Sequence, residues 1–314
     1  MGATCSSLMT RAPDTAVAPR DPRTDATRHG IALVAAASIC WSSGALIARL
    51  AGTGPWTTTF WRSVFAAAFL SLVVSLLRRR SIVALWREGG RPLVGAALCM
   101  ALASTCFIFS LAHTSVANTA LLMSTGPFVA GLLGWLVLGE RVPPRTWLTM
   151  ALALAGVVIM MSSSSGSGAL AGDLLAILMA ASFATATVLV RRHPEIQMTP
   201  AAALSTAITA AVALPLADPV ATTSRDLTLL ALFGVAQFGV GFLLFMAGAR
   251  LLPVAETSLI GMLEIVLGPL WVWLVLDERP GAASLAGGAL IFGALLAKTM
   301  IDLVPRRDGR PWRP

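Results

Sequence analysis

Long apolar runs, separated by short segments that contain glycine, proline or charged residues, recur along most of the chain. Each run is close to the ~20 residues that an α-helix needs to cross a bilayer. The apolar runs, delimited by the segments between them, predict ten helices. These lie at 30–50, 56–77, 92–112, 116–138, 145–162, 170–190, 199–217, 227–249, 254–276 and 281–301. The pattern therefore predicts an all-α integral membrane protein with ten transmembrane helices.

The segments between and beyond the predicted helices divide the chain into two halves. A Ser/Gly-rich linker at 163–169 separates five predicted helices within 30–162 from five within 170–301. The polar segment 1–29 lacks the apolar stretch of a signal peptide, which predicts a disordered cytoplasmic tail. A second, basic cytoplasmic tail is expected at 302–314.

The composition agrees with a membrane protein and excludes an ordinary soluble domain. Of the 314 residues 56% are hydrophobic and 12% are charged, whereas soluble domains contain about 25% charged residues. In a soluble protein the net charge of +8 would point to nucleic acid. Here the basic residues lie at the ends of predicted helices, so the charge indicates orientation in a lipid bilayer, and no nucleic acid is expected as a partner.

Nearly all basic residues fall on one side of the membrane if the N-terminus lies inside. Arginines occupy both tails and the connections after the second, fourth and sixth predicted helices, whereas Arg225 and Arg279 fall on the opposite side. Because positively charged loops stay in the cytoplasm, both termini are expected there. Lys298 is the only lysine among the 23 basic residues, a usage typical of a GC-rich genome, so we expect a multi-pass protein of the bacterial inner membrane.

The two halves also share sequence. V-A-N-T-A-L at 116–121 matches V-A-E-T-S-L at 254–259, and at the same offset W-L-V-L-G-E-R at 135–141 matches W-L-V-L-D-E-R at 273–279. Because each half has five predicted helices, the matching helices cross the membrane in opposite directions. Inverted repeats of this kind are typical of alternating-access transporters, whose substrate site lies near the midplane between the halves.

Several short motifs stand at positions typical of one transporter family: Trp41-Ser42, Arg62, Pro127, Leu138-Gly139-Glu140-Arg141, Gly156, Leu263-Glu264, Leu276-Asp277-Glu278-Arg279 and Gly287. With these motifs residues 30–301 resemble the EamA-type members of the drug/metabolite transporter (DMT) superfamily, which have ten helices. Ile265 stands where the family has a proline, and Asp277 where it has a glycine. The resemblance implies a secondary transporter that exports a small metabolite, such as an amino acid or a related compound, by alternating access.

Glu264 places a carboxylate near the middle of an apolar run. A charge at the bilayer centre costs at least ~2.5 kcal/mol, so such a group is expected to face the bundle interior or a wet cavity. It is either a proton- or cation-binding group of the substrate cavity, or a carboxyl group that packs by a hydrogen bond to a neighbouring helix. Trp271 lies seven residues later, so both can share one helix face.

Other side chains suit the substrate cavity. Trp41, Phe183, Gln237 and Trp271 lie on predicted helices that the resemblance places around the central cavity, and mixed aromatic and amide groups suit a small amphipathic solute. Tryptophans also serve as interfacial anchors, however. Arg62 lies within the second predicted helix, where it could bind an anionic group of the substrate, extend outward to water, or pair with a carboxylate at the outer end.

The sequence lacks the signatures of enzymes and metal sites. Cys40, Cys99 and Cys106 lie in apolar runs without metal-ligand spacing, and no metal or other cofactor is expected. Motifs such as H-E-x-x-H and G-x-S-x-G are absent, so an enzyme is not expected. The predicted function is transport of a small molecule, with Glu264 as the candidate for proton coupling, and the alternative is a membrane scaffold that binds a partner without transporting.

Overall fold

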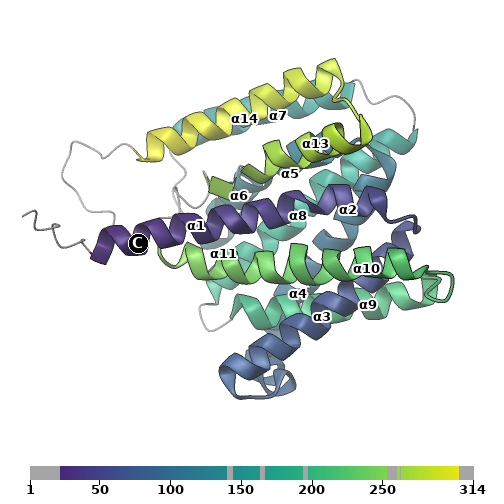
Figure 1. Ribbon diagram of the computed structural model, residues 1–314. Coiled ribbons are helices and arrows are strands. Elements are labelled where there is room, and N and C mark those ends of the chain that lie inside the picture. Colours follow the sequence, from purple (N-terminus) through teal and green to yellow (C-terminus); the bar gives the residue numbers. More distant parts are fainter. Residues whose placement is uncertain are drawn as a thin grey trace, which may run out of the picture.

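The structure, a computed structural model, describes residues 22–139, 144–162, 167–193, 197–252, 260–261 and 263–303. Every regular element in these residues is helical, which confirms the all-α prediction (Figure 1). The first half contains α1 (Pro22–Ser42), α2 (Gly44–Leu50), α3 (Pro55–Arg78), α4 (Ile82–His113), α5 (Val116–Met123), α6 (Gly126–Leu138) and α7 (Pro144–Ser162). The second half contains α8 (Ser167–Arg192), α9 (Met198–Ala213), η1 (Leu214–Leu216), α10 (Ser224–Leu232), η2 (Phe233–Val240), α11 (Gly241–Ala249), α13 (Leu263–Leu276) and α14 (Ala282–Leu303).

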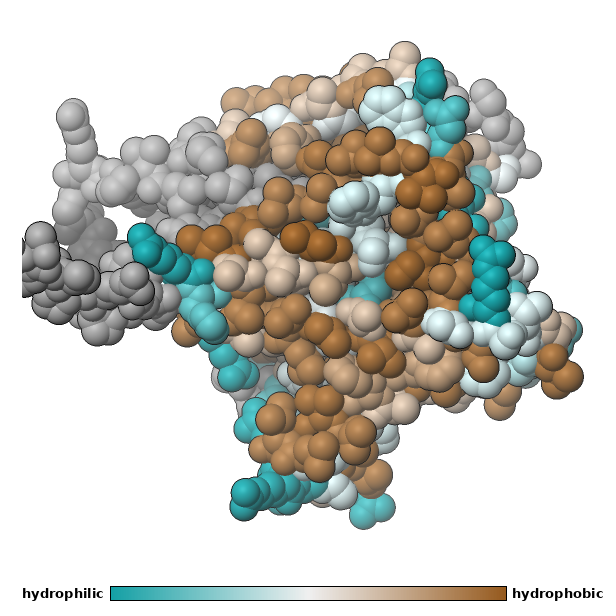
Figure 2. Space-filling model, viewed as in Figure 1, coloured by the Kyte–Doolittle hydropathy of each residue, from teal (hydrophilic) through white to brown (hydrophobic). Residues whose placement is uncertain are grey.

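Many of these helices have the length and composition of membrane spans. Within the described residues, seven helical segments qualify: Thr27–Leu50, Pro55–Arg78, Ile82–His113, Val116–Val137, Gly168–Val190, Met198–Leu216 and Ser224–Ala249. Shorter apolar helices lie at Trp147–Ile159, Leu263–Leu276 and Ala282–Ala294. Apolar residues cover the middle of the visible face, and hydrophilic residues gather towards its two ends (Figure 2). Such a band faces lipid, so the protein is a multi-pass membrane protein.

Two apolar runs that were predicted as single helices are broken. The run at 30–50 breaks between α1 and α2, and the run at 116–138 breaks between α5 and α6. At the first break the Ser43 hydroxyl donates to the Cys40 carbonyl at 2.7 Å, and at the second the Thr125 hydroxyl donates to the Leu122 carbonyl at 2.7 Å. Serine and threonine hydroxyls compete in this way with the helical hydrogen bonds.

A third irregularity lies in the predicted helix at 227–249. There η2 is a π-helical segment that joins α10 to α11 without a break in the chain direction. Two glycines let neighbouring helices approach closely: a Cβ atom at Gly234 would overlap the Arg62 carbonyl oxygen of α3, and one at Gly241 would lie 2.7 Å from the Trp41 ring. Short π segments inside α-helices frequently mark functional sites.

Two helices begin earlier in the chain than predicted. The helix predicted at 92–112 begins at Ile82 and kinks at Gly90, which has φ +57°. The structure also begins α1 at Pro22, inside the predicted tail 1–29. The remainder of that tail, the linker at 163–166 and Glu140 lie outside the described residues.

The bundle is held together mainly by contacts between the two halves. In the described residues α4 packs against α8 and α9, α3 against α9 and η2, and α1 against α11 and α13 (Figure 1). The helix α7 packs against α14, and α5 against α8 and α13. A core cluster of Leu70, Leu93, Met100 and Phe242 lies between α3, α4 and α11.

Candidate functional site

Three of the residues predicted for the cavity, Trp41, Gln237 and Trp271, come together where α1 ends. The Gln237 amide Nε2 donates to the Trp41 carbonyl oxygen at 3.1 Å. The Trp271 indole Nε1 donates to the Ser42 hydroxyl oxygen at 3.0 Å. The break between α1 and α2 is therefore in contact with both η2 and α13. A broken helix leaves backbone groups free for other partners, and the Gln237 amide binds one of them, the Trp41 carbonyl oxygen. We call residues 41–43 the α1 break.

Glu264 lies in the first turn of α13 and is half-buried. Gly268 and Trp271 follow at positions that share its helix face, and Trp271 contacts the α1 break. Over seven residues a helix rises about 10 Å, so the carboxylate lies within two helical turns of Trp271. Among the described residues no hydrogen bond or ion pair reaches Glu264. A packing role through such a bond is therefore not seen there, and the carboxylate can bind a proton, a cation or a ligand.

Arg62 is buried inside the bundle, with 4% of its surface exposed. Its Nη1 donates to the Ser104 hydroxyl of α4 at 2.6 Å. Its guanidinium carbon lies 4.7 Å from the ring centre of Phe233 and 4.8 Å from that of Phe238, both on η2. The side chain does not extend to the outer surface, and no carboxylate of the described residues pairs with it.

Phe183 is not brought into this group by any described hydrogen bond or ring contact. It lies on α8 with 45% of its surface exposed, and its carbonyl accepts a hydrogen bond from the Thr187 hydroxyl at 3.0 Å. The remaining five predicted residues lie on α1, α3, η2 and α13, which pack against one another in the pairs α1–α13, α1–η2 and α3–η2.

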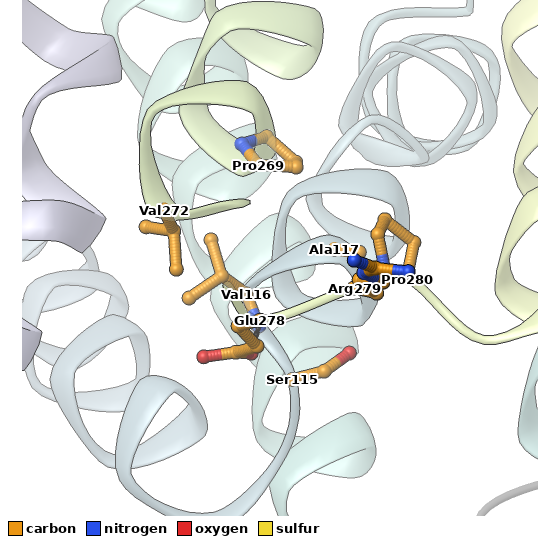
Figure 3. A pocket seen from close by; sticks show the side chains of 8 residues that line it. All are labelled: Ser115, Val116, Ala117, Pro269, Val272, Glu278, Arg279 and Pro280. Atoms are coloured by element: carbon orange, nitrogen blue, oxygen red, sulfur yellow. Dashed lines mark hydrogen bonds between the residues drawn. The ribbon is translucent and has the colours of Figure 1, made fainter. Parts of the chain in front are cut away.

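A polar contact connects helices at one end of the bundle, which we call the Arg49 end. The Arg49 Nε lies 3.3 Å from the Glu278 Oε2, and the Arg49 Nη2 donates to the Thr114 carbonyl at 3.0 Å. The Glu278 Oε1 also accepts from the Val116 backbone N–H at 3.0 Å. In Figure 3 the Glu278 side chain lies beside Val116, with Val272 near them. The space they leave is about 10 Å³, no larger than one water molecule needs.

A buried polar cluster lies next to this contact. Asp173 of α8 is fully buried and accepts hydrogen bonds from the Thr114 hydroxyl at 2.6 Å and from the Asn118 amide at 3.2 Å. The Ser284 hydroxyl of α14 donates to the Asn118 carbonyl oxygen. We call these four residues the Asp173 cluster, and it joins α4, α5, α8 and α14.

Sequence reasoning missed most of this end. The Ser115 hydroxyl caps the start of α5, where it accepts the Asn118 backbone N–H at 3.1 Å, and the Asn118 side chain points to Asp173. Asp173 could have been found by the signal that revealed Glu264, because it is an acidic residue inside a predicted apolar helix. Ser104 carried no such signal, since small hydroxyl residues are common in membrane helices.

Comparison with known proteins identifies the family. The sequence profile of the EamA-like transporter family matches residues 28–162 and again residues 170–299. The chain belongs to this family. It is therefore a transporter of the DMT superfamily rather than an enzyme, and it acts on a small molecule from within a membrane.

Individual relatives agree along most of the chain. This EamA family member is 31% identical to the pseudopaline exporter CntI of Pseudomonas aeruginosa, over 87% of its own length and 96% of the relative. It is 28% identical to the uncharacterized transporter YwfM of Bacillus subtilis, over 68% and 73% of the two chains. A solved protein structure matches with a TM-score of 0.62 at 20% identity, over 89% of this chain and 98% of that one, which supports the fold alone.

Proposed function

We propose that the protein is a secondary transporter that exports a small metabolite, such as an amino acid or a related compound, across the bacterial inner membrane. The observation that carries the proposal is the similarity to the pseudopaline exporter, which extends over nearly the whole length of both proteins. The uncharacterized transporter of Bacillus subtilis is a second bacterial relative.

Alternating access between two inverted five-helix repeats is the proposed mechanism. The two separate matches to the family profile support the repeat. The helix packing supports it as well. If each helix is replaced by its counterpart in the other half, the contact α4–α8 becomes α11–α1 and the contact α6–α8 becomes α13–α1, and all four contacts are present. The pairs α3–α9, α7–α14 and α5–α13 each join matching helices. Packing of this kind lets one half rock against the other around a central site.

The proposed substrate site lies at the α1 break and includes Trp41, Gln237 and Trp271, with Arg62 and Glu264 on the flanking helices. Broken helices near the midplane offer backbone groups to polar solutes, and the aromatic rings supply apolar contact area. Phe183 stays a candidate from α8, where a partly exposed ring could contact a substrate in another conformation of the transporter.

Glu264 is the proposed proton-coupling group, because a half-buried carboxylate without a partner among the described residues can exchange a proton during the transport cycle. In Glu264→Gln the side chain keeps its shape but cannot release a proton. We expect export from proteoliposomes to lose its dependence on a pH gradient, while exchange of substrate across the membrane persists.

The matched control is Glu88→Gln, which changes an exposed carboxylate paired with Arg80 at the surface. This variant should retain gradient-driven transport. Gradient-driven flux of normal size in purified, reconstituted Glu264→Gln would show that another group carries the proton or that transport is not proton-coupled.

The proposed function itself is tested with the purified protein. A thermal-shift screen against a panel of amino acids and related metabolites identifies compounds that raise the melting temperature, and flux in proteoliposomes tests each of them. We expect at least one compound both to raise the melting temperature and to be transported. If none is moved, and if thiol labelling finds the same accessible positions from both sides under all conditions, the protein is a membrane scaffold instead.

A further inference from the structure

Buried polar atoms without partners are concentrated at one contact between helices. Among the described residues, the buried side-chain nitrogen and oxygen atoms that lack a hydrogen bond are Arg62 Nε, Ser63 Oγ and Gln237 Oε1. Arg62 and Ser63 lie on α3, Gln237 lies on η2, and these two elements pack together. Because nearly all buried polar groups in proteins have a partner, each exception needs an explanation, and a bound ligand is one.

The guanidinium group of Arg62 is the charged member of this set. Ser104 binds its Nη1, and the rings of Phe233 and Phe238 cover it at 4.7 and 4.8 Å. The opposite edge, formed by Nε and Nη2, has no hydrogen-bond partner among the described residues. This is the edge that binds a carboxylate side-on through two parallel N–H···O bonds.

Packing alone does not require a cation at this position. The matching helix of the second half, α9, contains no basic residue in its sequence M-T-P-A-A-A-L-S-T-A-I-T-A-A-V-A, yet it packs closely against α3 and α4. A charge inside a membrane bundle is costly and persists where function needs it. The aromatic rings offset part of that cost but supply no negative charge.

A cavity lies at the Arg49 end, one helical turn from Arg62 along α3. Its volume is about 190 Å³, and it is lined by Ala48, Arg49, Thr53, Pro55, Thr58, Ile108, Leu111 and Ala112. Thr58 precedes Arg62 by four residues on α3, and Ile108 follows Ser104 by four residues on α4. Since residues four apart share a helix face, the Arg62–Ser104 pair lies one helical turn, about 6 Å, below this cavity. A cavity of this size has room for several water molecules or a small solute.

From these observations we infer that Arg62, with Ser104, binds a carboxylate group of the transported metabolite, and that the cavity between α2, α3 and α4 is the route by which this group reaches the Arg49 end. Arg49 lines the same cavity, so a second guanidinium group stands along the route. The inference rests on the proposed transport function and adds the chemical class of the substrate.

The test compares carboxylates with their uncharged amides, for example leucine with leucinamide and succinate with succinamide, in binding and in proteoliposome flux. The amide keeps its carbonyl oxygen as an acceptor and loses the second oxygen, so one charge-assisted hydrogen bond is lost, which corresponds to a change of roughly ten- to a hundredfold. We expect the wild-type protein to bind and move the acid at least about tenfold better than its amide, and Arg62→Gln to lose this preference.

Two further variants keep the test decisive. Arg80→Gln, which removes an exposed arginine at the opposite end of the bundle, should keep the preference of the wild type. Arg62→Lys retains the charge but not the planar fork, so it should fold and bind acids about tenfold more weakly. It replaces Arg62→Gln if that variant does not fold.

The outcomes separate this inference from the proposed function. If no compound in either class is bound or moved, the transport proposal fails. If compounds are moved but acids and amides are moved equally well, or if the Arg62 variants keep the wild-type preference for acids, transport stands and the carboxylate site is wrong.

Discussion

Single charged residues inside the bundle have different surroundings, and these decide their roles. Asp173 is fully buried and accepts hydrogen bonds from two side chains, whereas Glu264 has no such partner among the described residues. Arg62 has one hydroxyl partner and two aromatic neighbours. A satisfied buried charge stabilises one arrangement of helices, and an unsatisfied one is free to exchange partners.

Asp173→Ala should therefore act on stability. The substitution leaves the Asn118 amide and the Thr114 hydroxyl without their acceptor in a buried site, which costs about 1–3 kcal/mol for each unsatisfied group. We expect a clearly lower melting temperature of the detergent-solubilised protein. Glu88→Ala, at an exposed position, is the control and should melt like the wild type. Equal melting of all three proteins would contradict a structural role for the Asp173 cluster.

Sequence reasoning at this scale depended on how unusual a residue is in an apolar run. Glu264 and Arg62 stand out because charges are rare there, and the structure places both within the bundle. Asn118 does not stand out in the same way, because an amide near a helix start is typical of a cap. Its real partners, Asp173 and Ser284, are 55 and 166 residues away, and a single sequence does not reveal such distant contacts.

Among the elements, the breaks and the π segment were the features hardest to predict. Hydrophobic pattern identified a helical region in each predicted range, because apolar length is a strong signal in membrane proteins. It did not identify the breaks at Ser43 and Ser124–Thr125, because the side-chain hydroxyls that replace helical hydrogen bonds also occur in unbroken membrane helices. The α1 break and η2 nevertheless coincide with the candidate site, as in other transporters with discontinuous helices.

The contact between α3 and η2 provides a prediction for an element. A methyl group at Gly234 would overlap the Arg62 carbonyl, so Gly234→Ala must push η2 away from α3. Overpacking of this kind costs about 1–3 kcal/mol, and it also moves Phe233 and Phe238 relative to Arg62. We expect a lower melting temperature and slower transport.

The control for that substitution is Gly293→Ala. Gly293 lies on α14, and a Cβ atom there meets no other atom within 4 Å, so the helix should tolerate it. Transport and melting of Gly234→Ala at wild-type values would show that the α3–η2 distance does not matter for the cycle.

For the whole molecule, the Arg49–Glu278 contact joins helices at the Arg49 end, which the distribution of arginines predicts to face the outside. Arg49, Glu278 and the Val116 backbone connect α2, the start of α5 and the connection after α13. In an alternating-access cycle this contact must break before substrate can leave on that side. The Asp173 cluster lies beside it, fully buried, and we expect it to stay closed while the Arg49 contact opens.

Loss of the Arg49–Glu278 ion pair should favour the outward-open form. In a background without the native cysteines, Thr58→Cys in the cavity reports access from that side to a membrane-impermeant thiol reagent. We expect Glu278→Gln to increase its labelling rate up to about fivefold, because partly exposed ion pairs contribute about 0–1 kcal/mol.

Two comparisons check this expectation. Arg49→Gln should have the same effect, and the double variant should add little, since both changes remove one interaction. Glu88→Gln breaks the Arg80 pair at the opposite end and should leave labelling of Thr58→Cys unchanged. A labelling rate that does not respond to either Arg49→Gln or Glu278→Gln would show that this contact does not hold the end closed.

The Arg49–Glu278 contact has a consequence for the conditions in which the protein works. Each of the two side chains is 30% exposed, so dissolved ions reach them and weaken their attraction as ionic strength rises. The balance between the two open forms then shifts with the salt content of the medium outside the cell. If this contact closes the outer end in the proposed cycle, transport responds to the salinity of the medium as well as to the concentration of the substrate.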